Sequence, residues 1–240
     1  MSDRAVQDEV IRYLADARVR GHGSGTISAD EAAKASRFAH FLARRYYRDR
    51  LARSFRYSHR FFRQTGRTAE RVADRAEFSE FLTECRMGSL ESAQRVGEMA
   101  RVHLAAASSD PWWPDLLDYE YCYFLQAATA EHGIAAEQPS RGLSAVCRRF
   151  AWALPEMLPR LRAGDLIGDD LQRETTLLFS RTHAGRIYVV EVESALEKIF
   201  RAVDGRRTVE QIADAAGVST ATARAMLALL ANIGAVEFLS

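Results

Sequence analysis

Apolar and polar positions form the most regular pattern in the last third of the chain. Residues 175–182 and 186–192 are two apolar runs separated by His183, Ala184 and Gly185, a sequence typical of a turn, so they predict a β-hairpin. The apolar positions then change to helical spacing. Three helices and a short terminal strand are expected, at 193–203, 208–217, 219–234 and 235–239. This part predicts an α+β unit of about 65 residues, a size at which domains can fold alone.

The first two thirds of the chain predict helices. Apolar residues recur every three or four positions in 29–64, among them Phe38, Phe41, Leu51 and Phe55, which indicates one long amphipathic helix or two helices in line. Further helices are expected at 3–20, 68–86, 89–107 and 114–131. With 48% hydrophobic and 27% charged residues, the composition is that of a chain with a packed interior. The predicted fold class is mainly α, with the small α+β unit at the end.

The segment between these two parts predicts a loop, a strand and a linker. Residues 132–142 are typical of a loop, and residues 143–154 alternate enough to form a further strand beside the hairpin. Pro155 and Pro159 limit any following helix to a short piece. The expected organisation is a helical domain over 1–142, a strand and linker over 143–174, and the α+β module over 175–240.

The turn after the first helix of this module carries specific signals. Gly205 supplies the permissive backbone that a helix end needs, and Thr208 with Gln211 forms a capping box for the next helix. Together with Ala195, Leu196, Ile199, the run 204–212 and Gly234, these residues resemble the PqqD-like fold. That family is the recognition element of ribosomally synthesised and post-translationally modified peptides (RiPPs). The resemblance implies a winged-helix-like module that holds the leader of a precursor peptide while other enzymes modify it.

Positive charge is concentrated in one part of the helical region. Between Arg37 and Arg75 the sequence holds twelve arginines against three acidic residues, whereas the whole protein has a net charge of +1. This asymmetry indicates either a solvated helix face paired with acids elsewhere or an acidic partner. The aromatic stretch 112–124 is either the centre of a helical core or an interface. The candidate partner-binding residues are Arg44, Arg45, Arg48, Trp112 and Trp113.

The helical part shows a second resemblance. Arg37 and Phe38 begin an Arg-rich helix, the bulky residues 77–82 follow, and a Pro-Asp-Leu-Glu pattern lies within 111–120. This order is similar to that of the partner proteins of multinuclear non-heme iron-dependent oxidative enzymes, of the methanobactin and 3-thiaglutamate types, which act on peptide cysteines. The resemblance implies an accessory subunit that docks such an oxidase and presents the peptide to it. The iron and its ligands would then belong to the oxidase.

The last long helix favours a peptide over DNA as the ligand. A helix that reads bases offers Arg, Lys, Asn or Gln side chains, but residues 220–232 contain one basic residue, Arg224. Residues 174–240 hold seven basic and eight acidic residues, too few cations for phosphate binding. An extended peptide can instead add to the edge of the second hairpin strand, beside an apolar helix face. The candidate peptide-binding residues are Arg186, Ile187, Tyr188, Val189, Val190, Glu191, Val192, Arg224, Leu227, Ala228 and Ala231. For Leu227 the alternative is a place in the core.

No catalytic constellation is evident in the sequence. Histidine pairs with metal-ligand spacing, Cys-x-x-Cys motifs and phosphate-binding glycine loops are all lacking, so no catalytic residue, metal or cofactor is expected. Cys85, Cys122 and Cys147 are expected to be free buried thiols. The sequence has no membrane-spanning apolar run and no signal-peptide core, so a cytoplasmic location is expected. The main hypothesis is a non-catalytic partner of a peptide-modifying oxidase. The alternatives are a winged-helix transcription regulator and a stand-alone enzyme.

Overall fold

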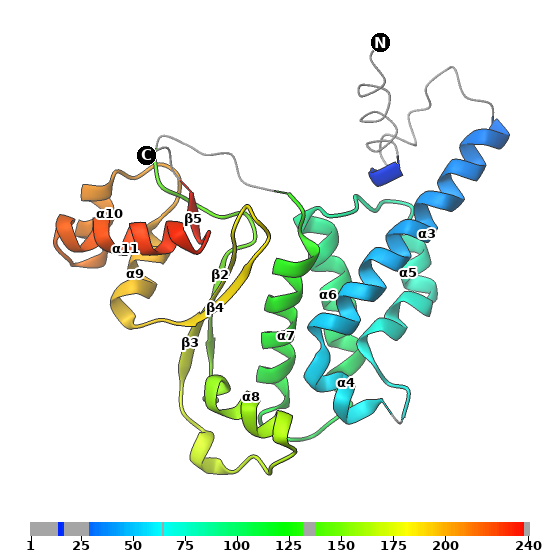
Figure 1. Cartoon of the computed structure of the whole chain (residues 1–240), viewed down its shortest axis with the longest axis horizontal. Helices are drawn as coiled ribbons and strands as arrows, with labels where there is room; N and C mark the ends of the chain where they lie inside the picture. Colours follow the sequence, from blue (N-terminus) through cyan, green and yellow to red (C-terminus); the bar gives the residue numbers. More distant parts are fainter. Residues whose placement is uncertain (1–13, 17–28, 64, 132–137, 238–240) are drawn as a thin grey trace. The chain divides into compact units, whose positions relative to one another are not determined.

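The structure is a computed structural model that describes residues 14–16, 29–63, 65–131 and 138–237. The chain divides into two compact units (Figure 1). The first comprises the chain up to Ser109 with Ala128–Ala130, and the second comprises Asp110–Ala127 and the chain from Glu131 onward. The helix expected at 3–20 and most of the loop expected at 132–142 lie outside the described residues.

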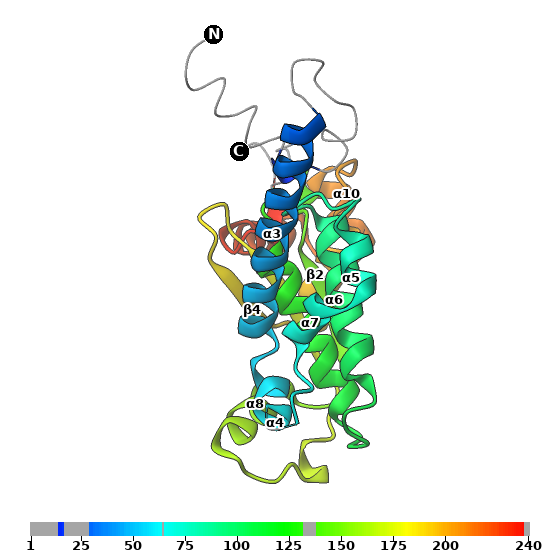
Figure 2. The same ribbon diagram turned by 90° about the vertical axis from the view of Figure 1, so that its right-hand side faces the viewer.

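The first unit is helical. The helix predicted for 29–64 is confirmed as two helices in line, interrupted at Phe55, whose backbone leaves the helical region with φ −88° and ψ 44°. The helix predicted for 89–107 is also confirmed. The Ser89 side chain caps its first turn by accepting a hydrogen bond of 3.1 Å from the N–H of Ser92. The elements of this unit, seen from the side in Figure 2, are α3 (Ala29–Ser54), α4 (Arg56–Phe62), the 3-10 helix η1 (Ala69–Asp74), α5 (Ala76–Phe81) and α6 (Leu90–Ala105).

One helix of this unit differs from its prediction. The single helix expected over 68–86 is instead the short pair η1 and α5, because Arg75 between them has extended backbone, with φ −85° and ψ 158°. The Arg44 guanidinium donates to the carbonyl of Ala73 at this junction. In a continuous helix that carbonyl would accept a backbone N–H from the next turn, and here the side chain takes its place. The break places Phe78 and Phe81 against Tyr47, with ring centroids 6.4 and 6.0 Å from that of Tyr47. These three rings are fully buried and form the centre of the unit.

The second unit combines one long helix, two small sheets and a group of three helices. The hairpin predicted for 175–192 is confirmed, and the further strand expected within 143–154 is confirmed as its neighbour. The mainly α class is confirmed as well, with the strands confined to this unit. The elements are α7 (Trp113–Ala128), β1 (Ser140–Arg141), β2 (Val146–Phe150), α8 (Leu154–Ala163), the 3-10 helix η2 (Asp169–Leu171), β3 (Thr175–Arg181), β4 (Ile187–Glu191), α9 (Ser194–Ala202), α10 (Val209–Ala216), α11 (Thr220–Asn232) and β5 (Val236–Glu237).

The main sheet has the antiparallel order β2-β3-β4, with Cys147 opposite Leu178 and Leu178 opposite Val190. Leu178 faces the cluster of α9, α10 and α11, whereas Phe179 faces α7, where its ring lies 5.4 Å from that of Tyr119. β3 is therefore covered on both faces. This explains why its sequence is a continuous apolar run rather than a strict alternation.

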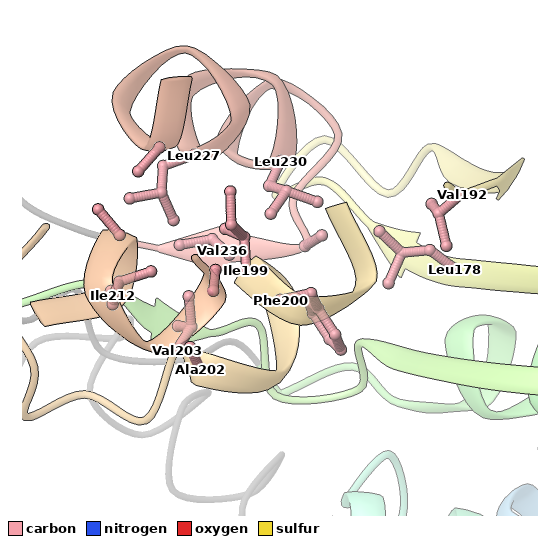
Figure 3. Close-up of a cluster of buried hydrophobic side chains, with 14 residues drawn as sticks. Leu178, Val192, Ile199, Phe200, Ala202, Val203, Ile212, Leu227, Leu230 and Val236 are labelled. Carbon is pink, nitrogen blue, oxygen red and sulfur yellow. The ribbon is translucent and has the colours of Figure 1, made fainter. Parts of the chain in front are cut away.

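The three helices α9, α10 and α11 enclose a buried apolar cluster that includes Ile199, Ile212, Leu227 and Leu230 (Figure 3). The capping box predicted for the second of these helices is present: the N–H of Gln211 donates to Thr208, and the N–H of Thr208 donates to the Gln211 side chain. Gly205 has the positive φ of 78° that the preceding turn requires. The last strand, β5, pairs with β1 rather than with the hairpin.

Two expectations for this unit need correction. The segment with Pro155 and Pro159 forms a ten-residue helix, α8, because Pro155 lies in the first turn, where a backbone donor is not needed, and buried residues such as Met157 and Leu161 anchor the rest. The sequence also groups the helix at 114–131 with the N-terminal helices, whereas α7 falls within the same compact unit as the sheet. Among the described residues, no helix combines the length and the hydrophobicity needed to cross a bilayer.

Candidate functional site

Within the part of the chain that the structure describes, β4 is an outer strand of the main sheet and pairs with β3 alone. The N–H of Val192 donates to Thr176 at 2.9 Å, and that of Thr182 donates to the carbonyl of Arg186 at 3.0 Å. In an antiparallel pair such bonds recur at every second residue. The even-numbered residues of β4 therefore bond to β3, and the N–H and C=O groups of Ile187, Val189 and Glu191 point away from it. In the described part of the chain, no strand pairs with these outward groups.

The side chains along this edge are apolar between its two charged ends. Tyr188 and Val190 project to the face that carries α9, α10 and α11, and Ile187 and Val189 project to the face that carries α7. All four are partly buried. A bound strand would therefore find apolar contacts on both faces of the sheet as well as backbone partners.

The opposite edge of the sheet is protected. On β2 the exposed residues Arg148 and Arg149 carry charge, and each is held in place by ion pairs. Arg148 bonds to Asp118, and Arg149 lies 3.6 Å from Glu174 and 3.5 Å from Glu197. Charged side chains on an edge strand oppose pairing with another chain. Of the two edges, β4 is therefore the one suited to accept a further strand.

Helix α11 presents two different flanks beside its buried face. Arg224, Ala228 and Ala231 share one flank, and Arg224 forms an ion pair of 3.0 Å with Glu210 of α10. Met226, Leu229 and Ile233 share the other flank. Met226 and Ile233 pack against the same buried cluster as Val190 of β4, and Leu229 is 60% exposed. The apolar flank of α11 is thus the one that carries Met226 and Leu229.

Several of the predicted peptide-binding residues lie elsewhere. Leu227 and Val192 are buried in the cluster of Figure 3, so for Leu227 the alternative assignment to the core applies. Arg224 is directed toward α10 by its ion pair with Glu210, and Ala228 and Ala231 lie on its side of the helix. Arg186, Ile187, Tyr188, Val189, Val190 and Glu191 do lie along the open edge. Leu229 was missed, although its position three residues after Met226, out of phase with the core positions, is a signal for a second apolar flank.

The predicted partner-binding residues are dispersed. Trp112 and Trp113 are buried, in accord with the alternative that the aromatic stretch is a core. The Arg44 guanidinium donates to the carbonyl of Ala73 and, at 3.0 Å, to the Ser79 hydroxyl, so two of its hydrogen-bond donors are occupied within the first unit. Arg48 lies 3.7 Å from Asp74, and Arg45 is exposed.

An exposed aromatic pair near these arginines was not expected. Phe38 and Phe41, which the sequence places on the apolar face of α3, are 51% and 56% exposed. In this part of the helix the small residues Ala39 and Ala43 are buried instead. Periodicity alone ranks a phenylalanine above an alanine as a core residue, which is why the phase of the helix was misassigned at this end.

Among the described residues near β4, no group of side chains is arranged for catalysis or for metal binding. Burial, and then the charge of Glu197, raise the pKa of the Cys147 thiol to about 11, which keeps it protonated. None of the three cysteines forms a disulfide; Cys85 and Cys122 are buried as expected, whereas Cys147 is only partly buried. Among the described residues, no group of three or more His, Cys, Asp or Glu side chains could hold a metal ion. The sequence matches no protein-family model, and comparison with curated proteins finds no relative.

Proposed function

We propose that this protein is a non-catalytic partner subunit that binds the leader of a ribosomally made precursor peptide along β4 and presents the peptide to an iron-dependent oxidase that modifies cysteine. In this proposal the hairpin and α9, α10 and α11 act as a winged-helix-like RiPP recognition element. The observation that carries the proposal is the open edge of β4, where the backbone groups of Ile187, Val189 and Glu191 point outward and, among the described residues, pair with no other strand.

The edge has the properties that peptide addition requires. Each backbone hydrogen bond to an added strand contributes about 0.5–1.5 kcal/mol net, so several in register give useful affinity. Pockets for alternate side chains supply specificity. Here Tyr188 and Val190 offer such contacts on the face of the sheet that carries α11, and Met226 of α11 packs against the same buried cluster as Val190. The capping box at Thr208 and the turn at Gly205, which underlie the resemblance to recognition elements, both form.

The first unit is assigned the partner-docking role. Its helix α3 exposes Arg45 together with Phe38 and Phe41, and arginine and aromatic residues are enriched at protein interfaces. The oxidase would supply the iron and its ligands, and this chain would supply only peptide binding and positioning. Holding a substrate near a catalytic centre replaces a bimolecular encounter by an intramolecular one, which explains how a subunit without chemistry of its own can accelerate a reaction.

The alternative function, a DNA-binding regulator, has weaker support. The exposed side chains of α11 include a single cation, Arg224, and its charge is paired with Glu210. Sequence-specific readout needs several side chains that reach base edges, and affinity needs several phosphate contacts. A salt-dependent gel shift with DNA fragments from the gene's own neighbourhood would favour this alternative over peptide binding.

The test is a titration of the purified chain, by fluorescence anisotropy, with synthetic leader peptides translated from short reading frames beside its gene. Saturable binding is expected for the wild-type chain, and the affinity is expected to fall by about tenfold in Val189→Pro. Because the N–H of Val189 points outward, proline there removes a donor to the peptide but no bond to β3. Val189→Ala keeps the N–H and is the matched control, expected to retain most of the binding.

A second variant verifies the register on which this test depends. The N–H of Val190 bonds to β3, so Val190→Pro is expected to destabilise the sheet by about 1–3 kcal/mol more than Val189→Pro, measured by urea unfolding. Equal binding by Val189→Pro and the wild-type chain would show that the edge is not the peptide site. The absence of saturable binding to any of the leader peptides, with the oxidase present or absent, would count against the function itself.

A further inference from the structure

We infer that the open edge of β4 selects peptides by the order of their charges, and that it takes a peptide with basic residues toward its N-terminal end and acidic residues about five positions later. The inference rests on the proposed peptide-binding function and adds the class of sequence that the site accepts. It follows from opposite charges at the two ends of one strand.

The end of β4 at Glu191 is acidic. Beside it lies an open hollow of about 550 Å³. The hollow is lined by Arg149, Glu174, Thr175, Thr176, Glu191, Val192, Glu193, Ser194 and Glu197. The single cation of this lining, Arg149, is already paired with Glu174 and Glu197. Glu197 is also held by Arg201 at 2.8 Å.

Two carboxylates at this end are left for a ligand. Glu191 and Glu193 are exposed, and among the described residues neither has an ion-pair partner. A cluster of acids alone would not define a binding site. Here the cluster lies at the end of a strand whose outward backbone groups pair with no other described strand, so a peptide on the edge would bring its side chains to the hollow.

The other end of β4 is cationic. Arg186 precedes the strand, is exposed, and lies over the ring of Tyr188, with its guanidinium carbon 5.0 Å from the ring centroid. This contact favours a position of the guanidinium along the strand. Among the described residues, Arg186 has no carboxylate partner. A carboxylate of a bound peptide could therefore pair with it.

The distance between the two ends sets the spacing of the peptide's charges. Arg186 and Glu191 are five residues apart, which corresponds to about 17 Å along a strand. The sheet is antiparallel throughout, so an added strand that continues the pattern runs opposite to β4. The N-terminal part of the peptide then lies beside Glu191 and Glu193, and its C-terminal part lies beside Arg186. A peptide with the reverse order of charges would place like charges together at both ends.

The expected preference is moderate because the groups are exposed. Single surface ion pairs contribute little, so we expect about a tenfold difference in Kd between two peptides of the same composition and opposite charge order. The difference should shrink when salt rises from about 0.02 M to about 0.5 M, since the Debye length falls to a few ångströms. Charge order thus acts on specificity, and the backbone edge supplies most of the affinity.

The experiment uses a display library of random peptides of about twelve residues, long enough to span the strand. It is selected on four forms of the full chain: wild type, Val189→Pro, a charge-reversed form with Arg186→Glu, Glu191→Arg and Glu193→Arg, and a control with Arg206→Glu and Asp214→Arg. The control reverses two exposed charges that lie outside β4 and outside the hollow. Thermal unfolding of each form verifies that it is folded before selection.

Peptides that depend on the edge are those enriched on the wild-type chain and lost on Val189→Pro. We expect these to carry basic residues before acidic ones, the charge-reversed form to enrich the opposite order, and the control to match the wild type. Edge-dependent peptides without any charge order, or with an order that charge reversal leaves unchanged, would overturn this inference and leave peptide binding intact. A selection with no edge-dependent peptides would overturn the proposed peptide site, and the inference with it.

Discussion

Cys147 shows how the environment of one residue sets its chemistry. Its thiol lies on β2, on the side of the sheet that faces the buried cluster, and burial raises its pKa to about 11 from the usual 9.0. Since the thiolate is the reactive form, a rise of two pKa units lowers the thiolate fraction about a hundredfold at neutral pH. We expect iodoacetamide to alkylate Cys147 at pH 8 about a hundredfold more slowly than a cysteine in a short peptide, measured by peptide mass spectrometry. The urea-unfolded chain should react at the peptide's rate, and a fast reaction in the folded chain would contradict this.

We expect His103 to make the stability of the first unit depend on pH. Burial, and then the charges of Arg75 and Arg67, lower its pKa below the usual 6.5, and its Nδ1 lies 2.7 Å from the guanidinium of Arg75. The unfolded chain therefore binds a proton at His103 more readily than the folded chain. Stability from this residue is complete above pH 6.5 and is lost as the pH falls through the lowered pKa.

The measurement for His103 is thermal unfolding between pH 8 and pH 5. We expect Tm to decrease toward acid in the wild-type chain and to decrease less in His103→Gln, which cannot be protonated. His183→Gln, an exposed histidine in the hairpin turn, is the control and should keep the wild-type dependence. An equal loss of Tm in the wild type and His103→Gln would show that another group causes the acid sensitivity.

The candidate site was predicted in part. The continuous apolar run Ile187, Tyr188, Val189 and Val190 was sufficient to identify a strand with two apolar faces, because side-chain direction in a strand follows directly from sequence position. The helix residues were assigned less well. Leu227 faces the core, and Met226 and Leu229 form the second apolar flank. The sequence did not show which side of α11 faces the core, because this helix is apolar nearly all round.

The capping box at the start of α10 is an element whose geometry follows from its sequence. Thr208 accepts the N–H of Gln211 at 3.3 Å, and Gln211 returns a bond to the N–H of Thr208 at 3.0 Å. We expect Thr208→Ala to lower the free energy of unfolding of the second unit by about 1 kcal/mol, measured by urea unfolding. Thr208→Ser keeps the hydroxyl oxygen and should recover most of the loss. If the alanine and serine variants unfold at the same midpoint, the cap does not contribute to stability.

Elements with local signals were predicted, and those decided by distant contacts were not. The hairpin, α9, α10 and α11 follow from apolar spacing together with turn and cap residues. By contrast, α8 forms despite Pro159 because its buried side chains outweigh one missing hydrogen bond. At the break between η1 and α5, the Ala73 carbonyl has its partner in Arg44, 29 positions earlier in the chain. Neither effect can be seen within a window of neighbouring residues.

The division of the chain into units depends on contacts between segments that are far apart in sequence. A loop-like stretch at 132–142 and prolines at 155 and 159 suggest a boundary near residue 142, and composition offers no other sign. The compact unit that contains the sheet nevertheless begins at Asp110. In it, Phe179 packs against Tyr119 of α7, and the N–H of Trp152 donates to Asp115 at 2.9 Å. The helix α7 therefore completes one face of the β-sheet.

This packing leads to a prediction about truncated chains. A fragment that begins at Asp110 keeps α7 against Phe179 and Phe150, whereas a fragment that begins at Leu143 exposes that apolar face of the sheet to water. We expect 110–240 to unfold cooperatively on heating, and 143–240 to aggregate or to lack a sharp transition, as judged by circular dichroism and size-exclusion chromatography. Replacement of Phe179 by serine in the shorter fragment should improve its solubility without restoring cooperativity. A cooperative, monomeric 143–240 would mean that the sheet is stable without α7.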